Sequence, residues 1–216
     1  PRSKVYHINN GVDLEQFDYN TEHFRVDDPD LDDPNTFKVV YTGSIRKANG
    51  LGILVDAAKA IRDPRIKILV WGEGDEREEL TRRVMEEGLT NIVFKGKVEK
   101  KYVPSIVSRA DLNLVHWGEV HLIQYGVSYN KLFDYMAAGR PIFSTVRPGY
   151  SIWEKYDCGR DTEDTRPEPL AHELEKMAAL PPEELSRLGE NARKGAEDYD
   201  FRVLTQKLLN VIGEIE

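Results

Sequence analysis

Five short apolar runs recur along the chain, and a stretch with helical spacing follows each of them. The runs lie at residues 37–43, 66–72, 92–96, 111–116 and 141–145. Apolar residues fill the runs almost continuously instead of alternating with polar ones, which is typical of strands buried on both faces. Strands that alternate with amphipathic helices predict an α/β fold, in which a Rossmann-like parallel sheet carries helices on both faces.

The two ends of the chain differ from this pattern. Residues 5–13 are a short apolar run that ends in an Asn-Gly turn signal, and they predict a strand and a turn. Residues 17–35 carry many aspartates and two prolines, and they predict a solvated surface loop. After a short strand that begins at Cys158, helical stripes predict three helices, over 169–180, from 181 to about 197, and from about 199 to 212.

We expect a single domain over residues 1–216. Residues 1–35 form its linker and acidic loop, residues 36–160 its Rossmann-like core, and residues 161–216 its C-terminal helices. The chain does not begin with methionine and shows no signal peptide, so we expect it to be a piece of a longer protein. No apolar run approaches the length that a membrane span needs.

Composition narrows the classes of function. With 40% hydrophobic and 31% charged residues, a chain of 216 residues can bury a sizeable core. The net charge of −8 argues against nucleic acid as a partner, because nucleic-acid-binding domains are usually basic. Cys158 is the single cysteine, so the chain can form neither an intrachain disulfide nor a cysteine metal cluster, and it fits a reducing compartment such as the cytoplasm.

The most informative stretch is 126–145, with the sequence GVSYNKLFDYMAAGRPIFST. Ser128 suits a helix N-cap, the glycine after the two alanines suits a helix end, and the residues 131–138 between them predict a short, largely buried helix. Its one acid, Asp134, needs a partner when buried: a backbone amide, a lysine, or a pair of ligand hydroxyls. Lys131 lies at the helix start, where free amides and the helix dipole favour an anion such as phosphate.

Residues 131–142, KLFDYMAAGRPI, resemble the donor-binding segment of family-4 retaining glycosyltransferases, which have the GT-B fold. The resemblance implies that Asp134 holds the ribose hydroxyls of a nucleotide-sugar. Many members have a further acid eight positions earlier that contacts the sugar; here that position is Gly126, so the chain departs from the two-acid pattern. The serine-x-asparagine-lysine order of residues 128–131 resembles the subgroup that builds bacterial cell-surface polysaccharides.

A candidate phosphate site follows the first strand. Residues 43–50 contain two glycines and precede a helical stripe, and a strand, a glycine loop and a helix in this order can cradle a phosphate. The loop is neither a dinucleotide fingerprint nor a P-loop. In relatives, an arginine after the first glycine and a lysine before the second hold the diphosphate; here those positions are Ser44 and Asn49. The bases are displaced to Arg46 and Lys47. One of these two side chains contacts the diphosphate, or Lys131 at the helix start does more of that work. In the remaining alternative, Arg46 and Lys47 are both surface charges.

Further candidates lie at the ends of the other strands. Lys97 and Val98 follow the third strand, at the point where relatives hold the base by backbone contacts. His116 ends the fourth strand, where ligand groups gather in open α/β sheets, although a lone histidine is more often structural. Glu119, in the loop that follows, is a candidate for the missing sugar-side carboxylate. With no third ligand near His116 and His121, a zinc site is not expected, and no motif for a divalent metal is present.

The resemblance implies the C-terminal, nucleotide-sugar-binding half of a retaining glycosyltransferase, which moves a hexosyl group from a UDP or GDP donor to an acceptor hydroxyl. The implied catalytic residues are Lys131 and Arg46, with His116, Glu119 and Gly126 on the sugar side. The implied donor-binding residues are Gly43, Ser44, Arg46, Lys47, Asn49, Lys97, Val98, Ser128, Asn130, Lys131, Leu132 and Asp134. No cofactor is expected. The acceptor would be a glycan or lipid-linked glycan held by a missing N-terminal half, and the full-length enzyme would be cytoplasmic or peripheral on the inner membrane face.

Two other functions remain open from the sequence. A sugar-nucleotide epimerase shares the GT-B fold, but it would need acids and histidines in its site for proton transfer, and the histidines here are few and scattered. A non-enzymatic α/β interaction module would use the same fold for protein contacts and would bind no nucleotide.

Overall fold

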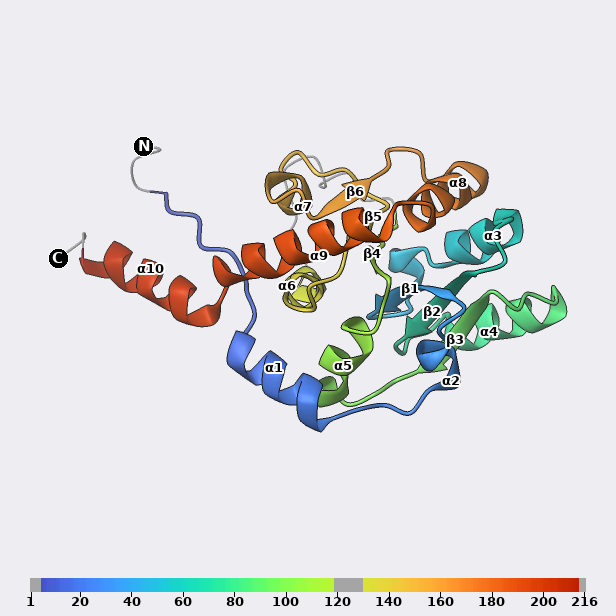
Figure 1. Cartoon of the computed structure of the whole chain (residues 1–216), viewed down its shortest axis with the longest axis horizontal. Helices are drawn as coiled ribbons and strands as arrows, with labels where there is room; N and C mark the ends of the chain where they lie inside the picture. The colour runs from blue at the N-terminus through green and yellow to red at the C-terminus, as the bar shows by residue number, and fades with distance from the viewer. Residues whose placement is uncertain (1–4, 119–129, 214–216) are drawn as a thin grey trace.

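The computed structural model describes residues 5–118 and 130–213, and its centre is a six-stranded parallel sheet (Figure 1). The strands are β1 (Phe37–Thr42), β2 (Ile66–Trp71), β3 (Ile92–Gly96), β4 (Leu112–Val115), β5 (Ile142–Ser144) and β6 (Gly159–Asp161). Their order is β3-β2-β1-β4-β5-β6, and every neighbouring pair is parallel. The predicted α/β, Rossmann-like parallel sheet is therefore confirmed, and the sixth strand is the short one expected after Cys158.

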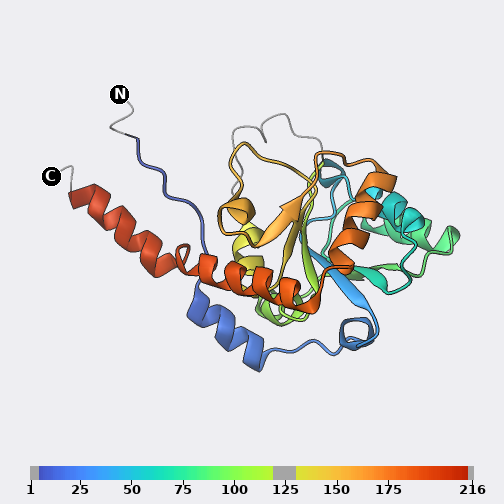
Figure 2. The ribbon, with the colours of Figure 1, turned by 45° about the horizontal axis from the view of Figure 1, so that its top comes forward.

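Helices cover both faces of the sheet, as predicted (Figures 1 and 2). One layer contains α3 (Gly52–Ala60), α4 (Arg77–Glu86) and α8 (Pro167–Ala178); the other contains α5 (Val103–Val107), α6 (Asn130–Ala137), α7 (Ile152–Lys155) and α9 (Pro182–Glu197). The side chains of successive strand residues face opposite helix layers, because side chains alternate across a sheet. Val39 and Tyr41 of β1 pack with the first layer, and Val40 packs with the second.

The strand order places the ends of β1 and β4 side by side at the point where the sheet reverses its direction of winding. Open α/β sheets bind ligands beyond the carboxyl ends of the strands at such a point. The loop after β1 contains a short 3₁₀ turn, η2 (Lys47–Asn49), and leads into α3. The order of the strands thus brings residues 43–50 close to the residues that follow β4.

Both predictions for the N-terminal 35 residues are wrong. Residues 5–13 form no strand, and their one described bridge joins Val12 to Asp200. Residues 17–35 are no solvated loop, because they include most of α1 (Leu14–His23) and all of α2 (Pro29–Asp32). Each helix starts at an aspartate cap: Asp13 accepts a hydrogen bond from the amide of Gln16, and Asp28 accepts from those of residues 30 and 31.

The acids of this segment pair with basic side chains from elsewhere in the chain: Asp28 and Asp30 are partly buried, and Asp32 is exposed. The Lys95 ammonium of β3 lies 2.7 Å from Asp28 and 2.5 Å from Asp30, and Lys67 of β2 also pairs with Asp30. Asp32 pairs with Arg109, at 2.7 Å. These ion pairs attach α2 to the sheet edge, so the acidic composition of the segment reflects charge complementarity with the sheet.

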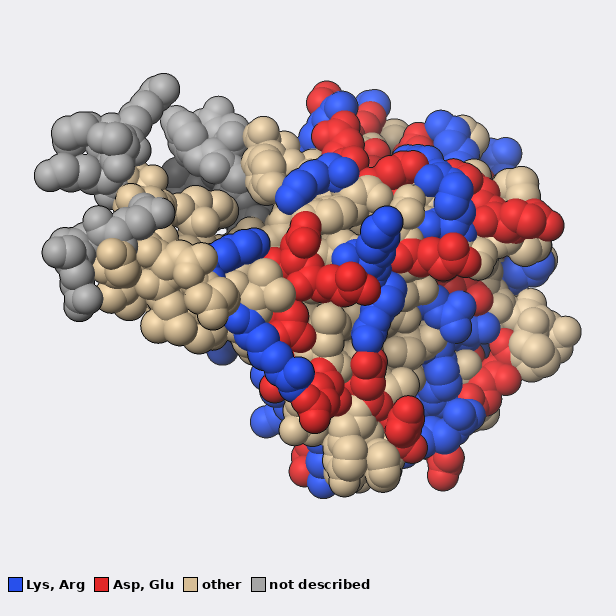
Figure 3. Space-filling model, turned by 60° about the vertical axis from the view of Figure 1, so that its left-hand side comes forward, with Lys and Arg blue, Asp and Glu red and all other residues tan. Residues whose placement is uncertain are grey.

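The last helix, α10 (Phe201–Gly213), points away from the sheet, and its apolar residues Leu208, Leu209 and Ile212 are about half exposed (Figure 2). Among the described helices, none has the length and apolar content to cross a bilayer. On the face that Figure 3 shows, acidic and basic side chains are interspersed.

Candidate functional site

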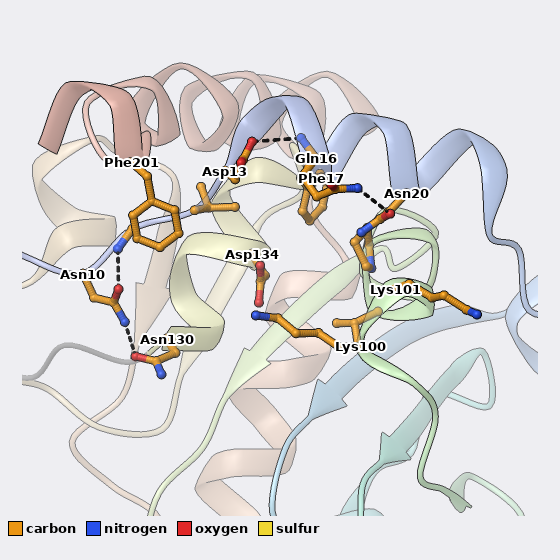
Figure 4. Close-up of a pocket in the computed structure, with 14 residues that line it drawn as sticks. Asn10, Asp13, Gln16, Phe17, Asn20, Lys100, Lys101, Asn130, Asp134 and Phe201 are labelled. Atoms are coloured by element: carbon orange, nitrogen blue, oxygen red, sulfur yellow. Dashed lines mark hydrogen bonds between the residues drawn. The ribbon is translucent and has the colours of Figure 1, made fainter. Parts of the chain in front are cut away.

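One cavity opens at the carboxyl ends of β1, β2 and β3, and a second adjoins it between α1, α5 and α6. The strand-end cavity, about 420 Å³, is lined by Thr42, Gly43, Ser44, Trp71, Gly72, Glu73, Lys97, Val98, Lys100 and Val103. The α1–α6 cavity, about 460 Å³, is lined by residues 10–13 and by Gln16, Phe17, Asn20, Lys100, Lys101, Val103, Pro104, Asn130, Asp134 and Phe201 (Figure 4). Lys100 and Val103 line both, so a ligand that reaches from one cavity into the other passes these two residues.

Helix α6 lines the α1–α6 cavity with Asn130 and Asp134, and it matches the short, buried helix predicted over 131–138. The hydroxyl of Tyr135 accepts a hydrogen bond of 2.9 Å from the amide of Thr42, which fixes α6 to the end of β1. Gly139 ends the helix with φ 63°, a conformation that glycine adopts without strain. The predicted glycine end is confirmed.

Lys131 carries a buried ammonium that has no hydrogen-bond partner among the described residues. Its nitrogen lies 3.9 Å from the centre of the Tyr41 ring, in cation–π geometry. A β-carbon placed on Gly43 would lie 2.5 Å from the same nitrogen, so the ammonium is directly beside the first glycine of the loop. Burial lowers the pKa of Lys131 to about 7. An anion that bound beside Gly43 would supply the partner that this cation lacks.

Asp134 points its carboxylate into the α1–α6 cavity (Figure 4). Burial raises its pKa to about 6, and the charge of Lys100 acts in the opposite direction. No hydrogen bond from the described part of the chain reaches this carboxylate, so the backbone-amide partner considered from the sequence is not found there. A carboxylate with free acceptor sites facing a cavity can hold a pair of hydroxyl groups.

The loop after β1 is built on close backbone approaches. A β-carbon on Gly72 would lie 1.7 Å from the carbonyl oxygen of Gly43, and one on Gly74 would lie 2.1 Å from that of Ile45. Only glycine allows this approach. The backbone of residues 43 and 44 is thereby held at the edge of the strand-end cavity.

The displaced bases of the loop, Arg46 and Lys47, are exposed, and neither lines the strand-end cavity or the α1–α6 cavity. Asn49 is buried. The Lys131 ammonium therefore lies directly beside Gly43, whereas the two bases within the loop are exposed. Which of these three contacts a diphosphate stays a prediction.

Three other predicted donor-binding residues lie where a nucleotide could reach them, and a fourth does not. Lys97 and Val98 line the strand-end cavity. Asn130 lines the α1–α6 cavity and accepts a hydrogen bond from the side chain of Asn10. Leu132 is fully buried in the core beneath α6.

His116 makes protein contacts with both ring nitrogens. Nε2 lies 3.1 Å from the carbonyl oxygen of Gly50, so this nitrogen carries the proton and donates, and Nδ1 accepts from Thr145 Oγ1 at 2.8 Å. The side chain is buried, and burial lowers its pKa to about 4. These contacts attach the end of the glycine loop to β4 and β5. They agree with the structural alternative for this histidine, and its sugar-side role stays a prediction.

Three predicted residues, Glu119, Gly126 and Ser128, lie outside the described residues.

Two residues of the site were missed from the sequence. Tyr41 was assigned to the core as part of a strand, and Lys100 belongs to a lysine-rich stretch without a motif. The position of Lys100 near Asp134 depends on the packing of η3 (Lys100–Tyr102) against α1 and α5, both of which contact α6, and no local pattern reveals it. Within 5–118 and 130–213, no cluster of three or more histidine, cysteine or acidic residues could hold a metal.

The arrangement as a whole suits a ligand with an anionic part and a hydroxylated part. The anionic part would lie beside Gly43 and the Lys131 ammonium, and the hydroxyl groups would face Asp134. An aromatic or apolar part would fit the strand-end cavity near Trp71 and Val98.

Comparison with known proteins identifies the family of the chain. A family model described as Glycosyl transferases group 1 matches residues 36–179. The putative teichuronic acid biosynthesis glycosyltransferase TuaH of Bacillus subtilis is 23% identical over 212 residues, which cover 98% of this chain and 51% of TuaH.

Solved structures show the same fold. Anabaena HepE, in complex with UDP-glucose, superposes with a TM-score of 0.71 at 17% identity, over 96% of this chain and 57% of HepE. A glycosyltransferase of Rickettsia africae superposes with a TM-score of 0.78 at 16% identity, over 100% of this chain and 58% of that protein. The chain thus spans about half the length of these relatives.

Proposed function

The chain belongs to the glycosyl transferases group 1 family, and on this premise we propose that it is the nucleotide-sugar-binding half of a retaining glycosyltransferase. The complete enzyme moves a hexosyl group from a nucleotide diphosphate to an acceptor hydroxyl and keeps the anomeric configuration. TuaH is named for teichuronic acid biosynthesis. Synthesis of a bacterial surface polysaccharide is accordingly the process that we propose.

One observation carries the proposal. Helix α6 holds a buried cation, Lys131, and a buried carboxylate, Asp134, and neither has a hydrogen-bond partner among the described residues. A buried charge without a partner costs free energy, so a fold that keeps two of them on one short helix is expected to offset that cost when a ligand binds. A ribonucleoside diphosphate carries both complementary groups, an anionic diphosphate and a ribose with two adjacent hydroxyls.

The proposed mechanism is electrostatic. Negative charge develops on the diphosphate as the bond to the sugar breaks, and pre-positioned donors stabilise that charge. Lys131 and the first amides of α6 supply them, together with Arg46 or Lys47 from the glycine loop. Asp134 orients the ribose, and Lys97 and Val98 hold the base. Positive side chains take the role that a divalent metal has in other transferases.

The donor is of the UDP or GDP type. HepE, a structural neighbour, has been solved with UDP and with UDP-glucose, which makes UDP the first nucleotide to try. No cofactor is needed. The acceptor, a glycan or lipid-linked glycan, binds to the rest of the enzyme, so the isolated chain binds nucleotide without transferring sugar. The full-length enzyme works in the cytoplasm or on the inner face of the membrane.

Calorimetric titration of the chain with UDP and GDP tests the proposal, with inorganic sulfate as the control for non-specific anion binding. We expect saturable binding of one nucleotide and none of sulfate at the same concentration. Absence of binding and of any thermal shift with both nucleotides would contradict the proposal and favour an interaction module. The epimerase alternative predicts that the full-length enzyme converts a nucleotide-sugar without an acceptor. The two protein contacts of His116 argue against this alternative, because they leave the ring no free nitrogen for proton transfer.

A further inference from the structure

Lys100 lies between the two cavities of the site. It is the first residue of η3, it lines both cavities, and its side chain extends from the wall opposite α6 toward the Asp134 carboxylate (Figure 4). A nucleotide that has its diphosphate beside Gly43 and its ribose at Asp134 must pass this side chain. Lys100 is thus placed to contact a bound nucleotide and to act on Asp134 before the nucleotide binds.

The neighbouring lysines have other partners. Lys95 pairs with two aspartates of α2, and Lys101 pairs with Glu99 at 3.2 Å while lying over two aromatic rings. Lys100 forms no ion pair with any of the described residues. Its charge therefore remains available to the carboxylate that it faces.

Other charged groups around Asp134 are directed elsewhere. On α6 itself, the Lys131 ammonium lies on the Gly43 side, and the Tyr135 hydroxyl contacts Thr42. The charged groups on the remaining elements near α6 have partners of their own: Asp13 caps α1, Arg193 of α9 pairs with Asp18 at 2.6 Å, and Lys101 pairs with Glu99. Among the described residues, Lys100 is the charge that lowers the pKa of Asp134 against the effect of burial.

We infer that Lys100 is a positioning residue for the nucleotide: its ammonium keeps the Asp134 carboxylate ionised, so that the carboxylate can accept two ribose hydroxyls, and it borders the bound ribose on the side opposite α6. The inference rests on the proposed function. It has a consequence that a purely structural lysine would lack. Loss of Lys100 should weaken binding most at the pH at which Asp134 titrates, whereas a loss of structure weakens binding by a similar factor at every pH.

The first test measures Asp134 without any nucleotide. The carboxyl carbon of Asp134 is followed by NMR from acid to neutral pH in the wild type, in Lys100→Met and in Lys101→Met. Methionine keeps an unbranched apolar stem and removes the charge. We expect the titration midpoint of Asp134 to move upward in K100M and to stay near the wild-type value in K101M, because Lys101 lines the same cavity but pairs with Glu99. An Asp134 midpoint that is equal in the wild type and K100M overturns the inference.

The second test measures nucleotide binding by the same three proteins, with UDP and GDP as probes. Relative to the wild type, K100M should bind about fivefold more weakly at pH 6 and less than about twofold more weakly at pH 8, the size expected for one exposed charge near a carboxylate. An equal loss at both pH values overturns the inference. If the midpoint moves but the protein binds neither UDP nor GDP, the proposed function is overturned instead, and the electrostatic effect of Lys100 on Asp134 stays supported.

Discussion

Two parts of the molecule hold partly buried charges, and they do so in opposite ways. In the α2 cluster (Asp28, Asp30, Lys67 and Lys95), each carboxylate lies within an ion-pair distance of at least one ammonium group. In the α6 pair (Lys131 and Asp134), a cation and a carboxylate lie on the same short helix, and neither has a hydrogen-bond partner among the described residues. The two charges of the pair also lie in different places: the Lys131 ammonium is beside Gly43, and the Asp134 carboxylate is in the α1–α6 cavity.

The difference separates structural charge from functional charge. Charges that are paired within the protein stabilise the contact between α2 and the sheet, and they leave little for a ligand to gain. Charges that are buried without partners destabilise the fold until something else pairs with them. Substitutions should therefore have opposite effects in the two places: loss of stability in the α2 cluster, and loss of ligand binding in the α6 pair.

The largest expected effect is on stability, in the α2 cluster. Lys95→Met leaves Asp28 and Asp30 without their shared cation, and we expect the free energy of unfolding to fall by about 3 kcal/mol, as when one partner of a buried pair is removed. Urea denaturation at pH 7 measures it. Lys101→Met is the matched control, because its pair with the exposed Glu99 should contribute less than about 0.5 kcal/mol. Equal stability of the two variants would mean that the cluster does not hold α2 to the sheet.

The second effect is on binding, in the α6 pair. Lys131→Met removes a cation that has no hydrogen-bond or ion-pair partner in the described chain and keeps an apolar stem beside the Tyr41 ring, so the free energy of unfolding at pH 7 should not fall. The affinity for UDP or GDP should drop by about 30-fold, equivalent to about 2 kcal/mol, which is typical of a charge-assisted hydrogen bond. Calorimetry on the variant and on K95M measures the contrast. Unchanged nucleotide affinity in K131M would remove Lys131 from the site.

The two regions also differ in how far the sequence predicts them. The strands of the sheet and α6 follow from local signals: continuous apolar runs, a terminal glycine and the donor-binding motif. The sequence predicts a loop for the N-terminal segment because the partners of its acids, Lys67, Lys95 and Arg109, are far away in the sequence. The caps of α1 and α2 are local signals that could have revealed both helices, since Asp28 precedes Pro29 at the first helical position.

The site is predictable only in part for the same reason. Lys131 and Asp134 stand in a recognisable motif, so the sequence identifies them. The ring under the Lys131 ammonium, from Tyr41, and the cation opposite Asp134, from Lys100, come from other elements of the fold. Whether a charge has a partner depends on those elements, and this is the property that distinguishes the α6 pair from the α2 cluster.

The third effect is the pH dependence of stability, which should have opposite signs at Asp30 and Asp134. Burial raises the pKa of Asp30, but its hydrogen bonds with Lys67 and Lys95 outweigh burial and hold the pKa below the usual 3.8. Asp30 therefore stabilises the fold above about pH 4, and this contribution is lost as the pH falls through its lowered pKa. Burial raises the pKa of Asp134 from 3.8 to about 6, so between these values the folded chain binds more protons than the unfolded chain. Its contribution to stability therefore falls as the pH rises.

Urea denaturation of the wild type, Asp30→Asn and Asp134→Asn from about pH 3.5 to 7 measures both contributions. Relative to the wild type, D134N should gain about 1.5 kcal/mol of stability between pH 4 and 6.5, and D30N should be less stable across that range. The same sign for both variants would show that Asp134 is paired in the folded chain, as Asp30 is, and would remove the contrast between the two regions.

The smallest effect concerns the hydroxyl groups that Asp134 is proposed to hold. The wild type should bind a ribonucleoside diphosphate about fivefold more tightly than its 2′-deoxy form, since one hydrogen bond to a charged acceptor contributes about 1 kcal/mol or more. Asp134→Asn should weaken the ribonucleotide more than the deoxynucleotide and bring their ratio close to one. The deoxynucleotide serves as the internal control, because any general damage to the site weakens both ligands alike. Equal losses for the two nucleotides would leave Asp134 without a ribose contact, and the carboxylate would then need another partner to explain why it is buried beside an open cavity.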